Sequence, residues 1–437
     1  MHNTLTKGLS PVIAAAALVA TAHPALAASR PLDLSAAVSA ALSTSPAVTA
    51  AEARIGAADA RQGEAGARML PTVTLSATPL HIGIIDSNLS HMLKAMAPGL
   101  DLGFMLSETL SVTQPLYTGG RLGLGQEAAA AGKAMAQEGA RLSRQSVAFD
   151  TANAYLNVLR AESLLTAVLE SDRQAQAHFK DAQAREKNGI GTRFDTLQAQ
   201  TALANVKGRV IQARNAVKLA RLSLSTAIHE PLDDRALLAP SLPAVTADDG
   251  AVESGIQARP EVKVAQGQQR IDALSTEITR RGLLPTVGVS GMLLANKLDV
   301  PGYAIIGSAS WELFDGGKIH AQIRAGEKTQ EADAANLQAL REGIRLEVEK
   351  AIADRSEAKE RIAAAEQGLK TAQAGFDLAQ LRYSEGAGTG TEAIDAESTV
   401  SQARATYIQA TYDALAAELK IAKALGLDLA GMLNGKA

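Results

Sequence analysis

The chain has 437 residues, with 43 Lys and Arg against 46 Asp and Glu, which gives a formal net charge of −3. Only 3% of the residues are aromatic, and compact cores obtain much of their burial from aromatic side chains, so the composition argues against ordinary globular domains and favours long, closely packed helices. The near balance of charge argues against nucleic acid as a partner, and the absence of cysteine excludes disulfides, thiol catalysis and an acylated N-terminal cysteine.

Residues 1–27 have the pattern of an export signal. Lys7 is the only formally charged side chain in this stretch, an apolar run covers residues 11–22, and residues 25–27 form the small-residue cleavage pattern Ala-Leu-Ala. A short N-terminal membrane anchor is the alternative, but the apolar run is too short to span a bilayer. We therefore expect a mature chain that begins at Ala28 and acts beyond the inner membrane.

The rest of the chain contains one unit twice. The segment 45–73 recurs as 259–287, with Pro near its start and Leu-Pro-Thr-Val at its end, and the segment 116–121 recurs as 313–318 around Gly-Gly. Duplication of this kind indicates two tandem structural repeats. The predicted organisation is a signal peptide at 1–27, repeat 1 at 28–228, a proline-containing connector at 229–247, repeat 2 at 248–426 and a tail at 427–437.

Both repeats show the same predicted order of elements. A helix comes first, followed by two strands, a Gly-Gly bend, a very long helix without proline, a glycine turn and a return helix. The strands alternate apolar with small polar residues, as the wall of a transmembrane barrel does; a soluble hairpin is the alternative, but the chain offers no other core for it to cover. The predicted bounds are strands at about 72–80, 102–116, 286–296 and 303–314, long helices at about 121–187 and 318–384, and return helices at about 192–228 and 391–424.

The long helices carry a coiled-coil pattern, which is clearest in repeat 2. Every seventh position from 344 to 379 is Ile or Ala, and the row four residues further on, from 348 to 376, includes Val, Ile, Leu and Phe. A helix of about 67 residues is a rod of roughly 100 Å. The first helix and the return helix of a repeat together approach that length, so we expect them to stack end to end beside the long helix.

The number of strands predicts an assembly. Single-chain outer-membrane barrels have about eight strands or more, and lipid does not tolerate an open sheet edge. Four predicted strands cannot close a barrel, whereas three identical chains supply twelve. The predicted fold class is therefore mainly α with β: a trimeric α-helical coiled-coil barrel, or tunnel, with a shared 12-stranded transmembrane β-barrel.

A series of short motifs follows the same order in both repeats. In repeat 1 they are Ser45-Pro46, Leu70-Pro71-Thr72, Gln114-Pro115-Leu116-Tyr117, Gly119-Gly120-Arg121, Ala154-Tyr155-Leu156 and Gly189 with Asp195. In order, spacing and duplication they resemble the TolC-type outer-membrane efflux proteins over essentially the whole mature chain. The resemblance implies a passive exit duct of a tripartite efflux pump or type I secretion system, located in the outer membrane of a Gram-negative cell with a large periplasmic portion. It also implies a homotrimer, a periplasmic adaptor and an inner-membrane transporter as partners.

Glycines mark the expected changes of direction. The predicted strand-to-helix bends contain Gly119, Gly120, Gly316 and Gly317, and the predicted turns at the periplasmic tip contain Gly189, Gly191, Gly386 and Gly388. These turns are expected at the periplasmic ends of the helix pairs, farthest from the strands, and the tip is where functional residues can be placed.

Acidic residues follow the tip turns. Glu392 and Asp395 stand three residues apart on one helix face, so a threefold axis would make them a ring of six carboxylates that attracts cations. The resemblance carries an acidic selectivity pair onto these two positions, with Asp195 as the one matching acid of repeat 1. The alternative role of these acids is to cap and complement the helix N-termini.

The resemblance also implies a polar latch at the tip. Tyr383 matches the latch tyrosine, whereas Gly388 stands at the position of the latch arginine in repeat 2. Arg382 and Arg193 are the candidates for replacing that arginine.

No residue pattern in the sequence points to catalysis. The Gly-Gly bends lack the Gly-Lys-Ser/Thr ending of a phosphate loop, and His81 and His91, in a loop near 81–101 that only repeat 1 contains, are expected to be solvated rather than a metal pair. We expect no enzymatic activity, no cofactor, no metal and no nucleic-acid partner, with outer-membrane lipid as the surroundings of the strands. A periplasmic coiled-coil adaptor or scaffold protein is the alternative function, although duplication of the whole chain does not fit an adaptor.

Overall fold

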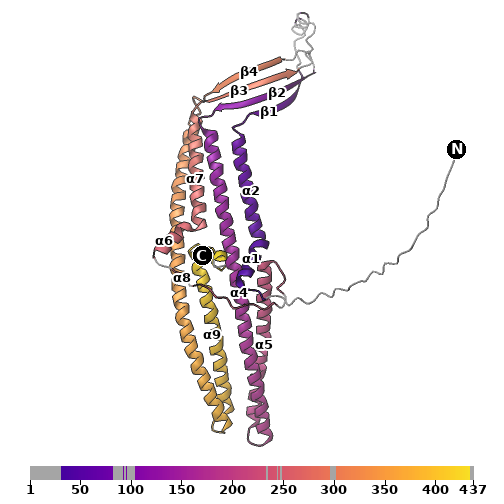
Figure 1. The fold of residues 1–437 in the computed structure, drawn as a ribbon, viewed down its shortest axis with the longest axis vertical. Helices are drawn as coiled ribbons and strands as arrows, with labels where there is room; N and C mark the ends of the chain where they lie inside the picture. Colours follow the sequence, from indigo (N-terminus) through magenta and orange to yellow (C-terminus); the bar gives the residue numbers. More distant parts are fainter. Residues whose placement is uncertain are drawn as a thin grey trace, which may run out of the picture.

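The computed structural model is an elongated molecule with a small sheet at one end of a set of long helices (Figure 1). It describes residues 31–81, 104–232, 235–243, 245–246, 249–295 and 302–433, together with the isolated residues 92 and 95. The predicted signal peptide and nearly all of the loop near 81–101 lie outside the described residues. Within the described residues, no single helix has the length and apolar character needed to cross a bilayer, although the bent pair 34–44 and 46–67 passes that test when taken together.

The order of elements is duplicated. Repeat 1 contains α1 (Leu34–Thr44), α2 (Pro46–Ala67), β1 (Thr72–His81), β2 (Phe104–Tyr117), α4 (Arg121–Lys187) and α5 (Arg193–Ile228). Repeat 2 contains α6 (Asp249–Ala258), α7 (Pro260–Arg280), the short 3₁₀ helix η1 (Arg281–Leu283), β3 (Thr286–Ala295), β4 (Gly302–Ser310), α8 (Lys318–Ser384) and α9 (Gly390–Ala424), and the chain continues into α10 (Leu429–Leu433). The mainly α fold with β and two tandem repeats is confirmed.

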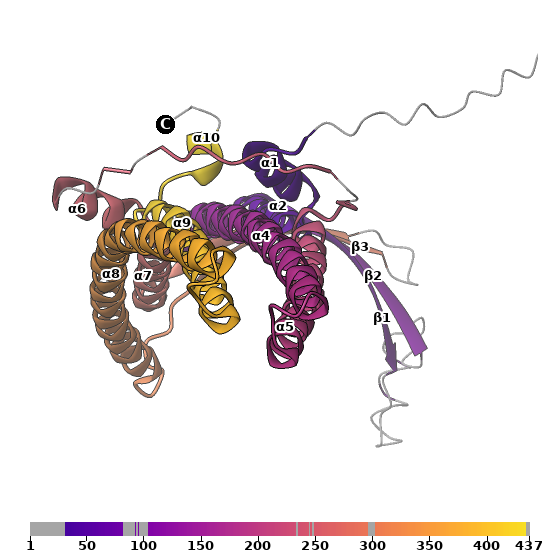
Figure 2. The same ribbon diagram turned by 90° about the horizontal axis from the view of Figure 1, so that it is seen from below.

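The helices form one curved row. α2 and α5 both pack on α4, α7 and α9 both pack on α8, and α4 also contacts α7 and α9. Seen along the helices, the row therefore runs from α5 with α2, through α4 and then α9 with α7, to α8 (Figure 2). A row that curves without closing leaves one helix layer with two free ends.

The main hydrophobic core lies midway along the helices, where α1 and α10 also pack on α4 (Figure 2). Its most deeply buried side chains include Tyr155 of α4, Leu224 of α5, Val348 of α8 and Leu419 of α9, each with 0% exposure. Toward the tips, the buried positions of α4 are Ser171, Ala175 and Ala182. Small side chains let the helix backbones approach closely, which explains how a chain poor in aromatic residues packs.

Tyr155 joins three segments within this core. Its hydroxyl lies 2.8 Å from the carbonyl oxygen of Leu32 and 2.7 Å from that of Leu238. Leu32 also forms a parallel bridge with Leu237 of the connector. Burial raises the pKa of Tyr155 to about 12, so the hydroxyl remains a donor and holds the segment before α1 and the connector against α4.

Arg259 is the buried charge of the same region. Its side chain is 6% exposed and donates to both carboxylate oxygens of Glu261, at 2.7 and 3.1 Å, and to Glu347 at 3.1 Å. It also donates at 3.0 Å to the carbonyl oxygen of Ala424, at the C-terminal end of α9. One guanidinium therefore connects the start of α7 with α8 and α9. Hydrogen bonds to the two glutamates raise the pKa of Arg259 against the effect of burial.

The four strands form one antiparallel sheet in the order β1-β2-β3-β4. The prediction that the last strand continues to residue 314 is wrong, because β4 ends at Ser310. Ser310 pairs with Thr286, the first residue of β3, so the residues after Ser310 have no backbone partner in the sheet. The indole nitrogen of Trp311 instead donates to the carbonyl oxygen of Leu283 at 3.0 Å.

Pairs of glycines form the bends at which the chain passes from a strand into a long helix. The four glycines predicted at these bends have φ angles between 63° and 86°, and Gly120 and Gly317 are the N-caps of α4 and α8. In the second bend, the Asp315 carboxylate accepts from the backbone N–H groups of Gly317 at 2.8 Å and Ile319 at 2.6 Å. These bonds to the ionised form lower the pKa of Asp315.

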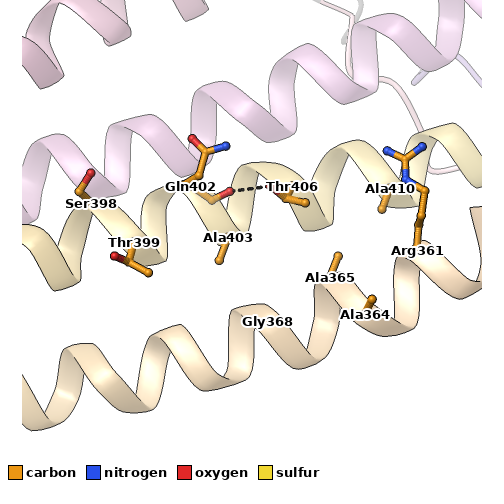
Figure 3. A pocket seen from close by; sticks show the side chains of 10 residues that line it. All are labelled: Arg361, Ala364, Ala365, Gly368, Ser398, Thr399, Gln402, Ala403, Thr406 and Ala410. Carbon is orange, nitrogen blue, oxygen red and sulfur yellow. Dashed lines mark hydrogen bonds between the residues drawn. The ribbon is translucent and has the colours of Figure 1, made fainter.

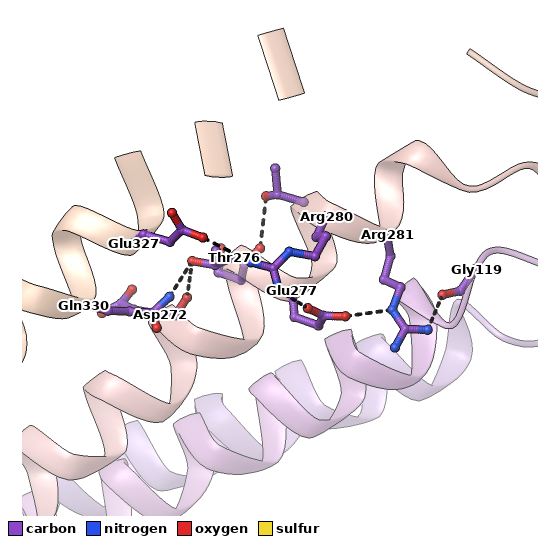
Figure 4. Close-up of polar contacts among 10 residues, drawn as sticks. Gly119, Asp272, Thr276, Glu277, Arg280, Arg281, Glu327 and Gln330 are labelled. Atoms are coloured by element: carbon purple, nitrogen blue, oxygen red, sulfur yellow. Dashed lines mark hydrogen bonds and ion pairs between the residues drawn. The ribbon is translucent and has the colours of Figure 1, made fainter. Parts of the chain in front are cut away.

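Polar contacts fix α7 between its neighbours just below the sheet (Figure 4). Arg281 donates to the carbonyl oxygen of Gly119 at 3.4 Å, and Arg280 lies 3.2 Å from Glu327 of α8. Thr276 of α7 accepts from the Gln330 amide of α8 at 2.9 Å. The contacts therefore bind α7 to α8, and bind η1, which follows α7 directly, to the bend before α4.

Gly326 of α8 gives a test of this close approach, because an added Cβ would overlap the side chain of Thr276. We expect Gly326→Ala to lower the free energy of unfolding by about 1–3 kcal/mol, the usual cost of overpacking. Gly343→Ala, in the same helix with nothing near the added methyl, should instead stabilise by up to ~1 kcal/mol. Denaturant unfolding of the purified protein measures both free energies. Equal stability of the two variants would show that close approach of α7 and α8 at Gly326 does not contribute to the free energy of unfolding.

Candidate functional site

Two turns of the same design stand at the end farthest from the sheet (Figure 1). In the turn between α4 and α5, Gly189 has a φ of 73° and the N–H of Gly191 donates to the carbonyl oxygen of Arg185 at 3.1 Å. A Cβ on Gly191 would lie 2.9 Å from the Cβ of Arg185, so this position also requires glycine. Gly386, Gly388 and Arg382 repeat the arrangement between α8 and α9. We call the tip halves of α4 and α5 the first hairpin and those of α8 and α9 the second hairpin.

The three predicted acids have different surroundings. The Asp195 carboxylate accepts from the N–H of Thr192 at 3.1 Å and from its hydroxyl at 2.7 Å, which completes the capping box of α5. Glu392 is exposed at the start of α9, with its carboxylate 3.8 Å from Arg382. Asp395, one turn further on, is exposed. Capping therefore occupies Asp195, whereas Glu392 and Asp395 present carboxylates to solvent.

The two arginines named as latch candidates stabilise their own turns. Arg382 donates to the carbonyl oxygen of Ala387 at 3.3 Å and faces Glu392. Arg193 at the start of α5 lies 3.5 Å from Glu186 at the end of α4. Each arginine thus contacts the hairpin to which it belongs.

Tyr383 connects the two hairpins. Its ring centroid lies 5.2 Å from that of His178 in α4, and the Arg185 guanidinium carbon lies 4.5 Å from the Tyr383 ring centroid. Arg185 also donates to the carbonyl oxygen of Ser384 at 3.3 Å. A guanidinium over an aromatic face is attracted by the ring quadrupole, so Arg185 and His178 are the partners of Tyr383 within the protomer.

Sequence reasoning missed these two partners. Arg185 occupies the position in repeat 1 that Arg382 occupies in repeat 2, so the duplication itself could have indicated Arg185. No sequence pattern singles out His178.

Further polar contacts between the hairpins lie above the turns. Thr391 of α9 donates to the side-chain oxygen of Gln198 in α5 at 2.9 Å. Ser401 of α9 is hydrogen-bonded to Ser171 of α4 at 3.3 Å. Arg209 of α5 also donates to the Ser401 hydroxyl, at 3.5 Å. These bonds tie α9 to both helices of the first hairpin.

Two hollows involve the second hairpin. One, of about 390 Å³, lies between the hairpins and is lined by His178, Arg185, Phe376, Tyr383 and Glu397, among others. The other, of about 690 Å³, is an open groove between α8 and α9 (Figure 3), where its lining includes Ala364, Ala365, Gly368 and Ala403. Across the part of the chain that the structure describes, no group of three or more acidic or histidine side chains is arranged to hold a metal ion.

Comparison with known proteins gives consistent matches. The family model described as outer membrane efflux protein matches residues 37–229 and 252–427, in both repeats. The pyoverdine export outer membrane protein OpmQ of Pseudomonas putida is 24% identical in an alignment 309 residues long that covers 66% of this chain and 64% of that protein. The chain thus aligns with somewhat less than two thirds of that relative's length.

Solved structures show the same fold. A structure of CusC superposes with a TM-score of 0.81 at 18% identity and covers 91% of this chain and 93% of its own. The outer membrane protein VceC of Vibrio cholerae superposes with a TM-score of 0.77 at 19% identity, over 90% of this chain and 96% of its own. At these identities, the likeness concerns the arrangement of helices and strands.

Proposed function

This chain belongs to the outer membrane efflux protein family, and from that premise we propose that it is a passive outer-membrane channel, the exit duct of a tripartite efflux pump or of a type I secretion system. The observation that carries the proposal is that neither the sheet nor the row of helices closes on itself within one chain. The sheet ends in the two outer strands β1 and β4, and the helices form a curved row whose two ends differ (Figure 2). Both features are completed by further copies of the same chain.

Three copies would complete the sheet. Pairing the β4 edge of one protomer with the β1 edge of the next makes twelve strands and leaves no open edge, which lipid requires. Leu75, Tyr303 and Ile305 on these edge strands are 75%, 79% and 76% exposed in the single chain. In a barrel such side chains are buried in the lipid of the outer membrane.

The same threefold assembly would close the helices into a tunnel. On α5, at one end of the row, Phe194, Ile211 and Leu222 are 69%, 70% and 61% exposed. Exposed large apolar side chains along a helix are candidates for an interaction surface, and the neighbouring protomer's α8 is the helix that would reach them. A periplasmic adaptor and an inner-membrane transporter are the partners proposed for the tip, and the family match favours the channel over an adaptor or scaffold protein.

The test is to purify the mature protein from outer membranes in detergent and determine its mass and conductance. We expect a trimer that forms conducting pores in planar bilayers. A stable monomer that remains in water without detergent, or release of the protein with the periplasmic contents, would overturn the proposal.

Cation preference tests the proposed acidic ring. In a trimer, Glu392 and Asp395 would supply six exposed carboxylates, and unit charges about 4 Å apart interact by about 1 kcal/mol even in bulk water. We expect the Glu392→Ala, Asp395→Ala double variant to lower the cation-to-anion permeability ratio about fivefold, measured as a reversal potential. Asp195→Asn tests the remaining predicted acid, whose carboxylate keeps its charge within the capping box, and it should lower the ratio less than the double variant does. An unchanged ratio in the double variant would reject the ring.

A further inference from the structure

Glu397 of α9 lies where the two hairpins of a protomer meet. It lines the hollow that His178 and Arg185 of α4 share with Tyr383 of α8. It also lines a second hollow, of about 170 Å³, that includes Arg209 of α5. The side chain therefore faces both helices of the first hairpin, although it belongs to the second.

The surroundings of Glu397 contain charges of both signs. The titratable and charged side chains lining the two hollows with it are His178, Asp181 and Arg185 of α4, Arg209 of α5, Tyr383 of α8 and Asp395 of α9. Burial raises the pKa of Glu397 to about 7, against the opposing attraction of Arg209. Burial also lowers the pKa of His178.

We propose that Glu397 makes the contact between the two hairpins pH-dependent: the protonated side chain keeps the tips docked, and ionisation favours their separation. The physical reason is that a neutral carboxyl group is buried at little cost, whereas a carboxylate prefers water. The inference rests on the proposed function, because separation of the tips would widen the periplasmic end of the duct.

The direction of the effect follows from proton linkage. Burial raises the pKa of Glu397 from its usual 4.5 to about 7. The part of that burial supplied by the first hairpin contributes to docking, and this contribution is fully present below about 4.5 and is lost as the pH rises through about 7. Between pH 6 and 8, the equilibrium constant for separating the tips of one protomer rises by up to about tenfold from this group. His178 acts in the opposite sense: its pKa is lowered in the docked state, so its contribution is present above about 6.5 and is lost as the pH falls.

The test compares variants, so that the effect of His178 cancels. Because the chain contains no cysteine, Asn188→Cys and Ala387→Cys place one spin label on each tip turn of the detergent-solubilised trimer. The ratio of separated to docked populations in the parent should rise between pH 6 and 8 by up to about tenfold relative to Glu397→Gln. Glu397→Leu, a second neutral variant, should behave like Glu397→Gln.

The control is Glu385→Gln, which removes an exposed carboxylate of the same tip turn and should keep the full response of the parent. A parent response that Glu397→Gln and Glu397→Leu leave unchanged would overturn the inference. Planar bilayers separate this result from a failure of the proposed function. If the protein forms pores but its pH response is the same in the parent and in the Glu397 variants, only the inference is rejected. If the labelled tips respond to pH through Glu397 but the protein forms no pores, only the proposed duct is rejected.

Discussion

Arg259→Ala is expected to lower the free energy of unfolding by about 3–5 kcal/mol, the cost of removing one partner from a buried ion pair. The side chain is 6% exposed and satisfies Glu261, Glu347 and the carbonyl oxygen of Ala424 at once. Its loss leaves Glu261 without the hydrogen bonds that lower its pKa against the effect of burial. It also leaves the C-terminal end of α9 without its donor. Denaturant unfolding of the purified protein, with the trimer concentration held fixed, measures the change.

Arg280→Ala is the matched control for Arg259→Ala. Arg280 lies 3.2 Å from each of two carboxylates, those of Glu277 and Glu327, but its side chain is 52% exposed. Exposed ion pairs contribute about 0–1 kcal/mol, so this variant should remain close to the parent. Arg259→Lys keeps the charge but not the planar set of donors, and should recover only part of the loss. Equal losses for Arg259→Ala and Arg280→Ala would mean that burial does not determine the contribution of Arg259.

Tyr155→Ala is expected to cost about 3–5 kcal/mol, because it empties a fully buried aromatic site in the core. Tyr155→Phe separates the ring from the hydroxyl. It keeps the packing but removes the donor shared by the carbonyl oxygens of Leu32 and Leu238. The Leu32 carbonyl still accepts from the N–H of Leu238, so the expected cost is that of an ordinary hydrogen bond, about 0.5–1.5 kcal/mol. The connector should then become more sensitive to protease in the phenylalanine variant. If Tyr155→Phe matched the parent in both stability and cleavage rate, the hydroxyl would not be what holds the connector.

The fold could be predicted where the signals are local. Paired glycines and long segments without proline mark the ends of α4 and α8, and the structure has both helices at the predicted residues. The strand that was predicted too long shows the reverse case. Residues 311–314 continue the apolar pattern of β4. Its pairing stops at Ser310, however, because Ser310 already faces Thr286, the first residue of β3.

The tip could be predicted only in part. Tyr383 was identified, but its partners Arg185 and His178 lie in the other repeat, and the contact depends on how two distant helices pack. Asp195 is one of the predicted ring acids, and the structure adds that its carboxylate also completes a capping box. Glu397 shows no sequence signal, because its raised pKa comes from burial between hairpins. Local patterns therefore indicate where the tips are, and tertiary packing determines which side chains meet there.

The position of the main core has a mechanical consequence. Val348 of α8 is fully buried in it, whereas Ser384, 36 residues further on, ends the helix at the tip. At ~1.5 Å per residue this is a stiff arm of about 54 Å, so a tilt of about 10° around the core would carry its far end through about 9 Å. The main core therefore acts as the point about which the tip half of α8 would pivot. A small shift in how α8 packs in the core would therefore move its tip by a distance comparable to the width of a helix.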